Sequence, residues 1–319
     1  MTYLYVFVGH FATVPPNARP DGSHMYGILI VGNRQPPNYK ENVQKFMADI
    51  ERDANQCGIN IRCGGPPMTC SDNSQDIDDK LRKMQQGGAR IVIVMLIIDA
   101  YGDVKLAADR LGLITQCLKW KNIERPPRGY HANIMLKINT KMGGTNHTLA
   151  SRMPKGVPFN GEVFQDPPAS LSWLFDKPCM LIGVDVSHPE PGSNRESMAV
   201  VVGSMNGRAS QYVALVSIQP ARVEMVSALE DNVKKLFETF KARNGGKMPA
   251  HVIVFRDGVS DGQMDRVLDI ELPAFQGAVA LMGYQSSDVK ISIVVCQKGH
   301  HTRFPSFYLL LFFLIYVLD

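Results

Sequence analysis

The sequence predicts an α/β protein of two domains, and three observations lead to this prediction. Strand-like and helix-like patterns alternate between residues 24 and 98. After residue 179, three strand-like runs follow one another and lead into an amphipathic helix and a fourth run. Between these parts, residues 151–178 are rich in proline and have no periodic pattern, as is typical of a linker. A chain of 319 residues is long enough for two domains of ordinary size.

The first predicted domain covers residues 24–150 and follows an irregular segment at 1–23. Apolar runs predict strands at 24–31, 59–62 and 89–98, and apolar residues at helical spacing predict helices at 39–56 and 75–86. This alternation predicts a parallel sheet covered by helices, a Rossmann-like arrangement. Ligands of such sheets bind beyond the carboxyl ends of the strands, and Tyr101 and Lys105 come directly after the third strand.

The second predicted domain begins at residue 179 with strands at 179–186, 197–204 and 211–218. Apolar residues from Val226 to Phe240 are spaced for one buried helix face, and the run Asn244, Gly245, Gly246 ends that helix. A fourth strand follows at 251–255. Three strands, a helix and another strand form the order of a ribonuclease-H-like core.

Charge is concentrated in one part of the chain. The net charge of +4 is small, but residues 101–141 hold eight Lys or Arg against three acids, so this stretch is +5 and the remainder is −1. A local positive field is what phosphate binding requires.

The six cysteines show neither CxxC pairs nor a dense disulfide framework. Reduced thiols in a cytoplasmic protein, or one that is also nuclear, are the expected state. The N-terminal segment has no Lys or Arg before Arg19 and makes a poor secretory signal.

A run of twelve apolar and aromatic residues occupies positions 307–318. It is shorter than the ~20 residues that cross a bilayer. We interpret residues 305–319 as an apolar tail produced by read-through or by a gene-model artefact. A buried strand or helix and a membrane anchor are the alternatives.

Three acidic residues occupy positions that suit a metal-dependent nuclease. Asp185 ends the apolar run 180–184, Asp257 ends the run 252–256, and Glu224 stands at the start of the amphipathic segment between them. Two strand ends and a helix entrance can bring three carboxylates to one cleft. Carboxylates gathered in this way repel one another unless a hard cation neutralises them, which favours Mg²⁺. Two such ions about 3.5–4 Å apart would serve phosphodiester hydrolysis.

Seven motifs occur in a fixed order along the chain. They are YGDVK (101–105), TQC (115–117), LKINTKMGG (136–144), GVDVSHP (183–189), VVGSM (201–205), FRDGVSDGQ (255–263) and CQKGHHTRF (296–304). The last four resemble the Piwi domain of Argonaute proteins, in that family's order and spacing. The first three resemble the Mid domain that precedes Piwi. The resemblance implies a Mid domain at 24–150 and an incomplete, ribonuclease-H-like Piwi domain at 179–304.

The resemblance implies that the first domain binds the 5′ end of a guide RNA. Five residues match the family's pattern: Tyr101, Lys105, Gln116, Lys137 and Lys141. Tyr101 would stack on the first base, while its hydroxyl and the other four side chains hold the 5′ phosphate. A terminal phosphate carries more charge than an internal one, so a site that selects it needs several convergent donors. The alternative for any single lysine is a solvated surface charge.

The resemblance also implies roles in the second domain. Asp185 and Asp257 match the family's catalytic, metal-binding aspartates, and Glu224 aligns with its mobile catalytic glutamate. His188 matches a family histidine outside the ligand set, so we interpret it as structural. The segment that lines the guide backbone in the family is matched by Lys298, His300, His301 and Arg303.

Cleaving members of the family have a fourth ligand, usually histidine, beyond that segment, and this sequence has no histidine after His301. We therefore expect a Mid–Piwi fragment that binds a small guide RNA in RNA-mediated gene silencing and does not cleave. Its expected partners are guide RNA, target RNA and silencing effector proteins, with no membrane. The alternative is a guide-directed, Mg²⁺-dependent endoribonuclease, if a full-length form supplies the fourth ligand.

A third class of protein is an α/β protein that binds small nucleotides. That class needs a glycine-rich turn between strand and helix, and the turn at residues 32–36 (GNRQP) is not one.

Overall fold

The computed structural model describes residues 19–146, 174, 176–207 and 209–297. The chain divides into two compact units, Met1–Pro168 and Ala169–Asp319. Most of the predicted linker, the segment before residue 19 and the apolar run 307–318 lie outside the described residues. The predictions for those segments therefore stay predictions.

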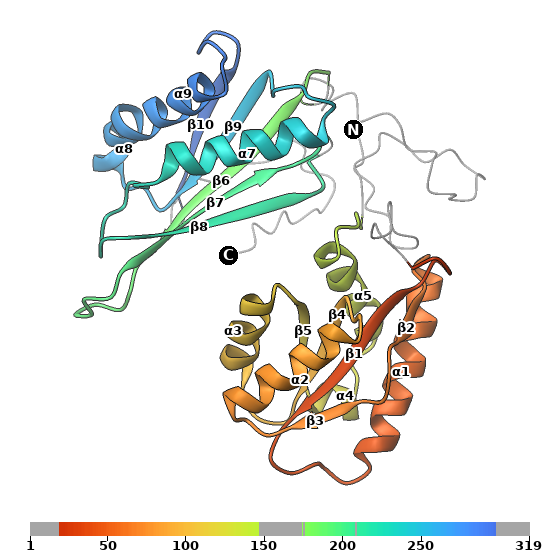
Figure 1. Cartoon of the computed structure of the whole chain (residues 1–319). Coiled ribbons are helices and arrows are strands. Elements are labelled where there is room, and N and C mark those ends of the chain that lie inside the picture. The colour runs from red at the N-terminus through yellow and green to blue at the C-terminus, as the bar shows by residue number, and fades with distance from the viewer. Residues whose placement is uncertain (1–18, 147–173, 175, 208, 298–319) are drawn as a thin grey trace, which may run out of the picture. The chain divides into compact units, whose positions relative to one another are not determined.

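The first unit is a parallel sheet between two layers of helices (Figure 1). Its strands are β1 (His24–Val31), β2 (Ile61–Cys63), β3 (Met68–Cys70), β4 (Ile91–Leu96) and β5 (Ile114–Lys119). Its helices are α1 (Tyr39–Gln56), α2 (Ser74–Gln86), α3 (Tyr101–Leu111), α4 (Lys121–Glu124) and α5 (Tyr130–Lys141). The strand order is β2-β1-β4-β5, β3 also pairs with β1, and all pairings are parallel. The predicted Rossmann-like arrangement is confirmed.

Alternation along the strands decides which helices cover each face. Tyr26, Ile28 and Ile30 of β1 pack in one core with α1, α4 and α5. Leu29 and Val31 pack in the other core with α2 and α3. A central strand with apolar residues on both faces must be covered on both sides, which is why β1 and β4 read as continuous apolar runs.

Two strands of this unit were not predicted. β3 has only three residues, and β5 contains polar residues, Thr115 and Gln116, that are nevertheless buried. The predicted strand at 59–62 lies two residues later, at Ile61–Cys63. Short and polar strands escape pattern analysis because their stability comes from neighbouring strands rather than from their own sequence.

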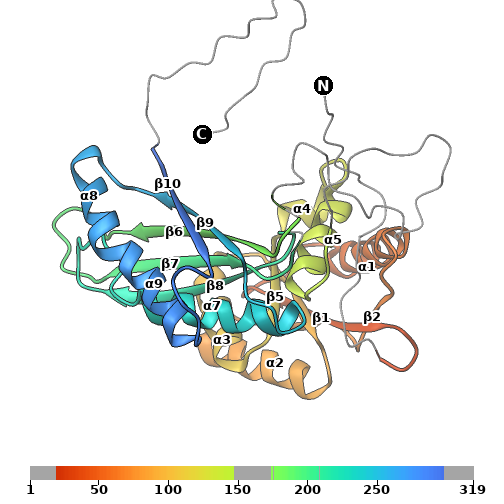
Figure 2. The ribbon, with the colours of Figure 1, turned by 90° about the horizontal axis from the view of Figure 1, so that it is seen from above.

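The second unit is a five-stranded mixed sheet with the order β10-β9-β6-β7-β8 (Figures 1 and 2). Its strands are β6 (Cys179–Ser187), β7 (Ser197–Ser204), β8 (Tyr212–Gln219), β9 (His251–Asp257) and β10 (Lys290–Cys296). The helices are α7 (Leu229–Arg243), η2 (Asp261–Gln263), α8 (Met264–Arg266), the π-helical η3 (Val267–Glu271) and α9 (Leu272–Leu281). β6, β7 and β8 form the predicted antiparallel meander, and β9 returns parallel to β6.

Helices α7 and α9 cover one face of this sheet. Val184 of β6 and Val254 of β9 point into that core, which is closed by Leu236 and Phe240 of α7 and Phe275 of α9. Because side chains alternate along a strand, the next residue of each strand faces the opposite side. That opposite face carries Asp185, and its exposed apolar residues include Ile218 of β8, 66% accessible.

The predicted end of the long helix is confirmed. Asn244 caps α7, and Gly245 and Gly246 follow with φ of 62° and 78°, a left-handed conformation that glycine adopts without steric cost. Among the helices that the structure describes, none is long and apolar enough to cross a membrane.

Candidate functional site

Two lysines of the first unit meet at the start of β5. Lys141, the last residue of α5, donates from Nζ to the main-chain oxygen of Thr115 at 2.8 Å and to Oε1 of Gln116 at 2.9 Å. Lys105 of α3 donates from Nζ to the same Thr115 oxygen at 3.1 Å and to Thr115 Oγ1 at 2.8 Å. Two ammonium groups from different helices therefore share one carbonyl oxygen.

Neither lysine forms an ion pair with the described part of the chain, although Asp109 lines the same cavity. Partial burial, together with the neighbouring charges of Lys105 and Lys137, lowers the pKa of Lys141 below the ordinary lysine value. Both ammonium groups line a cavity of about 350 Å³. An anion in this cavity would relieve the repulsion and favour the charged form of Lys141.

The other three predicted phosphate ligands surround this pair in different ways. Tyr101 begins α3, is 54% exposed, and has its ring centroid 5.8 Å from Nζ of Lys105. Lys137 is exposed one helical turn before Lys141. Gln116 differs from the prediction: its side chain is buried, and its amide nitrogen donates to the Cys117 oxygen at 3.0 Å.

A larger cavity of about 770 Å³ opens at the carboxyl ends of β4 and β5. Tyr101, Trp120 and Asp99 are among the residues that line it. This is the edge at which parallel α/β sheets bind ligands. Tyr101 thus lines the larger cavity, and its ring also contacts Lys105, which lines the smaller one.

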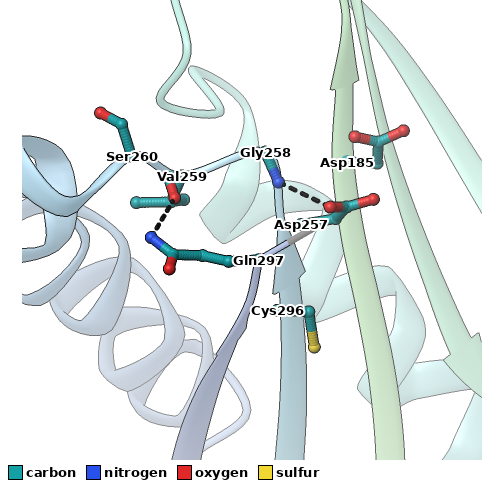
Figure 3. Close-up of a pocket in the computed structure, with 7 residues that line it drawn as sticks. All are labelled: Asp185, Asp257, Gly258, Val259, Ser260, Cys296 and Gln297. Carbon is teal, nitrogen blue, oxygen red and sulfur yellow. Dashed lines mark hydrogen bonds between the residues drawn. The ribbon is translucent and has the colours of Figure 1, made fainter. Parts of the chain in front are cut away.

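In the second unit, adjacent strands place two carboxylates side by side. Val184 of β6 is in register with Arg256 of β9, so Asp185 and Asp257 both come one residue later on neighbouring parallel strands. Both line a cleft of about 610 Å³, together with Cys296 and Gln297 at the end of β10. Figure 3 shows both carboxylates at this edge of the sheet.

Glycine is required at the turn beside Asp257. The amide of Gly258 donates to Oδ1 of Asp257 at 2.8 Å, and Gly258 has a left-handed φ of 81° (Figure 3). A Cβ atom at this position would lie 3.2 Å from Oε1 of Glu224 and 3.9 Å from Oδ1 of Asp185. All three predicted acids therefore come close to one turn.

The sequence predicts Glu224 at the entrance of a helix, and this prediction is wrong. Glu224 lies in the loop between β8 and α7, five residues before α7 begins at Leu229. Pro220 and the left-handed Arg222 (φ 63°) keep this loop out of the helix. The Gln219 side chain bridges this loop: its amide nitrogen donates to the Val223 oxygen, and its oxygen accepts from the Ser227 amide.

Two side chains fix the Glu224 carboxylate. Nε2 of His188 lies 2.8 Å from Oε2, and Nη1 of Arg256 lies 3.1 Å from Oε1. The other ring nitrogen of His188 lies 2.9 Å from the buried hydroxyl of Ser197. His188 thus connects Glu224 to strand β7.

The donors of the cleft suit a hard cation, because carboxylate oxygens are the ligands that Mg²⁺ prefers. Mg²⁺ often uses only one or two carboxylates and completes its shell with water and phosphate oxygens, so Asp185 and Asp257 fit this ion. The predicted gathering of three ligands is not found: within the described ranges, no three His, Cys, Asp or Glu side chains are arranged to hold a metal. The Glu224 oxygens contact His188 and Arg256, and Oε1 also lies 3.2 Å from the Cβ position at Gly258.

Comparison with known proteins identifies the family. The family model of the Piwi domain matches residues 91–307. The chain belongs to the Argonaute family. It is 33% identical over 297 residues to protein argonaute MEL1 of Oryza sativa subsp. japonica, which covers 83% of this chain and 26% of the rice protein. Protein argonaute 12 of the same plant is 34% identical over 252 residues, covering 73% of this chain and 22% of that protein. The chain thus spans about a quarter of the length of these relatives.

Solved Argonaute structures share the fold. The Kluyveromyces polysporus Argonaute with a guide RNA matches with a TM-score of 0.76 at 20% identity, over 91% of this chain and 33% of that chain. The Mid–Piwi domains of Neurospora crassa QDE-2 match with a TM-score of 0.70 at 24% identity, over 90% of this chain and 75% of that chain. The Rossmann-like first unit and the ribonuclease-H-like second unit are therefore the Argonaute Mid–Piwi fold.

The structure brings five of the predicted site residues together in two clusters. Lys105, Lys141 and Gln116 form one cluster, and Asp185 and Asp257 form another. The predicted guide-backbone residues lie outside the described residues: Lys298, His300, His301 and Arg303.

Sequence reasoning missed residues that contact these clusters. Thr115 accepts from both lysines, and the buried pair Arg256 and Glu271 supports Glu224. The sequence does contain a signal that Arg256 is buried. Side chains alternate along a strand, so Val252, Val254 and residue 256 share the buried face of the strand that begins at 251.

Proposed function

We propose that this chain binds the 5′-phosphorylated end of a small guide RNA and acts in RNA-mediated gene silencing. One observation carries the proposal: Lys105 and Lys141 share the Thr115 carbonyl without an acidic partner in the described residues, beside the exposed ring of Tyr101. The lysines supply charge for a terminal phosphate, and the ring supplies a surface on which the first base stacks. Target RNA and silencing effector proteins are the further partners, in the cytoplasm or also in the nucleus.

A binding experiment tests this proposal. Single-stranded RNA labelled at its 3′ end should bind the full chain at least about tenfold more tightly with a 5′ phosphate than with a 5′ hydroxyl, since charge-assisted hydrogen bonds contribute roughly 1.5–3 kcal/mol each. Fluorescence anisotropy at one fixed salt concentration measures both affinities, because salt alone changes RNA affinity strongly. Lys137→Ala combined with Lys141→Ala should flatten the preference. Equal affinity of the unmutated chain for both RNA ends would contradict the proposal.

A second candidate function is guide-directed, Mg²⁺-dependent cleavage of RNA. The observation that favours it is the shared cleft of Asp185 and Asp257, close to Glu224. A bound Mg²⁺ would activate water and neutralise phosphodiester charge. The protein residues would contribute the ligands at two strand ends, and the turn at Gly258 would hold Asp257 in place.

We expect the 319-residue chain to bind guide RNA without cutting a matched target. Among the residues that the structure describes, no group of three ligands is formed, and positioning errors near 1 Å cost about a hundredfold in rate. Incubation of the guide-loaded chain with labelled target RNA and Mg²⁺ checks this expectation. Cleavage opposite the guide that disappears in Asp257→Ala would show instead that the three carboxylates suffice.

A further inference from the structure

Arg256 is a charged side chain with no exposure to solvent. It lies one residue before Asp257 and points to the opposite, helix-covered side of β9. Its Nε donates to Oε1 and Oε2 of Glu271 at 3.2 and 3.0 Å, and its Nη1 donates to Oε1 of Glu224 at 3.1 Å. Its Nη2 donates to the main-chain oxygen of Glu224 at 2.7 Å. One buried cation therefore serves two carboxylates.

Glu271 reaches this position from the π-helical turn η3 and is only 1% exposed. Its Oε1 also accepts from the amide of Val226 at 3.3 Å, which ties it to the loop that carries Glu224. It is not among the residues that line the cleft of Asp185 and Asp257. Among the described residues, the Glu271 side chain thus connects to the cleft through Arg256 and the Glu224 loop.

The charges of these three residues do not cancel. Arg256 and Glu271 together are neutral, so the negative charge of Glu224 is in excess. That charge faces Gly258, whose Cβ position lies within 4 Å of both Glu224 and Asp185. If Glu271 were uncharged, Arg256 would neutralise Glu224 instead. The net charge of the groups around a site affects its affinity for a cation, and the Arg256–Glu271 pair that sets this balance is buried.

We infer that Glu271 is a positioning and charge-balancing residue for the cleft: by neutralising Arg256, it leaves the charge of Glu224 available to a divalent cation at Asp185 and Asp257. This inference rests on the cleft taking such a cation, as in the second candidate function, and is independent of guide binding. Two variants separate charge from shape. Glu271→Gln keeps the side-chain size and an oxygen acceptor while removing the charge. Glu271→Gln with Arg256→Gln removes both charges and leaves the pair neutral, as it is in the unmutated chain.

Mn²⁺ serves as the probe, titrated into the full chain at a fixed, mildly alkaline pH, with free Mn²⁺ followed by electron paramagnetic resonance. We expect Glu271→Gln to weaken Mn²⁺ binding on the order of tenfold, as follows from removing one buried charge near a divalent ion. The double variant should bind within about twofold of the unmutated chain, since its buried pair is again neutral. Asp257→Asn removes a proposed ligand, so the Mn²⁺ binding that this variant loses is the binding at the cleft. Circular dichroism checks the fold of each variant.

Several outcomes would overturn the inference. Unchanged Mn²⁺ affinity in a folded Glu271→Gln variant would show that its charge is irrelevant. A double variant that binds no better than Glu271→Gln would show that a neutral pair does not restore affinity, which contradicts charge balance. If Glu271→Gln does not fold, the double variant decides: near-normal affinity supports charge balance, and a tenfold loss overturns it. An unmutated chain without an Asp257-dependent Mn²⁺ site would overturn both this inference and the second candidate function, while the RNA-end experiment would still stand.

Discussion

Replacing Lys105 and Lys141 together by alanine should lower the affinity for 5′-phosphorylated RNA by at least about a hundredfold, because two charge-assisted bonds of roughly 1.5–3 kcal/mol each are lost. The affinity for 5′-hydroxyl RNA should change much less, since that RNA has no terminal phosphate for the pair to bind. Anisotropy titrations with both RNAs at one salt concentration give the two numbers. The comparison isolates the terminal phosphate from general attraction to the RNA backbone.

Each single substitution should cost less than half of the binding free energy that the double variant loses. The two ammonium groups share the Thr115 carbonyl and repel one another, so removing one also removes a repulsion that acts on the other. Lys83→Ala is the matched control, because Lys83 is an exposed lysine on α2 of the same unit. A loss of similar size in the control, or equal losses for both RNA ends in the double variant, would argue against a phosphate site at Thr115.

Arg256→Met should destabilise the second unit by about 3–5 kcal/mol, the cost of leaving a buried charge without its partner. The unpaired group is Glu271, which is 1% exposed and receives both of its side-chain ion-pair contacts from Nε of Arg256. Hydrogen exchange of the β9 amides in the full chain measures the effect. This observable reports on the second unit alone, which matters in a protein of two units.

Two further variants test whether buried charge is the cause. Arg256→Met combined with Glu271→Gln should recover much of the lost stability, because no uncompensated carboxylate remains at that position. Arg243→Met, an exposed arginine at the end of α7, should change stability by no more than about 0.5 kcal/mol. Unaltered exchange of β9 in Arg256→Met would contradict the account of this pair as a structural element of the sheet.

Much of the fold followed from local sequence pattern. Helix α1 was predicted with its observed bounds, and its Val43, Phe46 and Ile50 are buried as the 3.6-residue spacing requires. Strand β7 also has its predicted bounds, 197–204. Apolar runs this long have one favourable arrangement, because any other would expose them to water. The strands β3 and β5 lacked such runs and were missed for that reason.

The site was predictable where strand ends carry the function. Asp185 and Asp257 end apolar runs, and the parallel pairing of β6 with β9 then sets them side by side. The motifs also predicted Lys105 and Lys141 as phosphate ligands, and in the structure both donate to the Thr115 carbonyl. Their shared acceptor could not be foreseen, because it depends on where α3 and α5 pack against β5.

By itself, the sequence determined the α/β class, the helix faces and the identity of the charged residues at strand ends, all of which depend on neighbours a few positions away. Only the tertiary structure decided how those charges are compensated. Glu271 is 15 residues from Arg256, and Glu224 is 32 residues from it, yet all three meet behind the cleft. Burial makes this charge balance energetically important, and burial is a property of the packed sheet and its helices rather than of any local pattern.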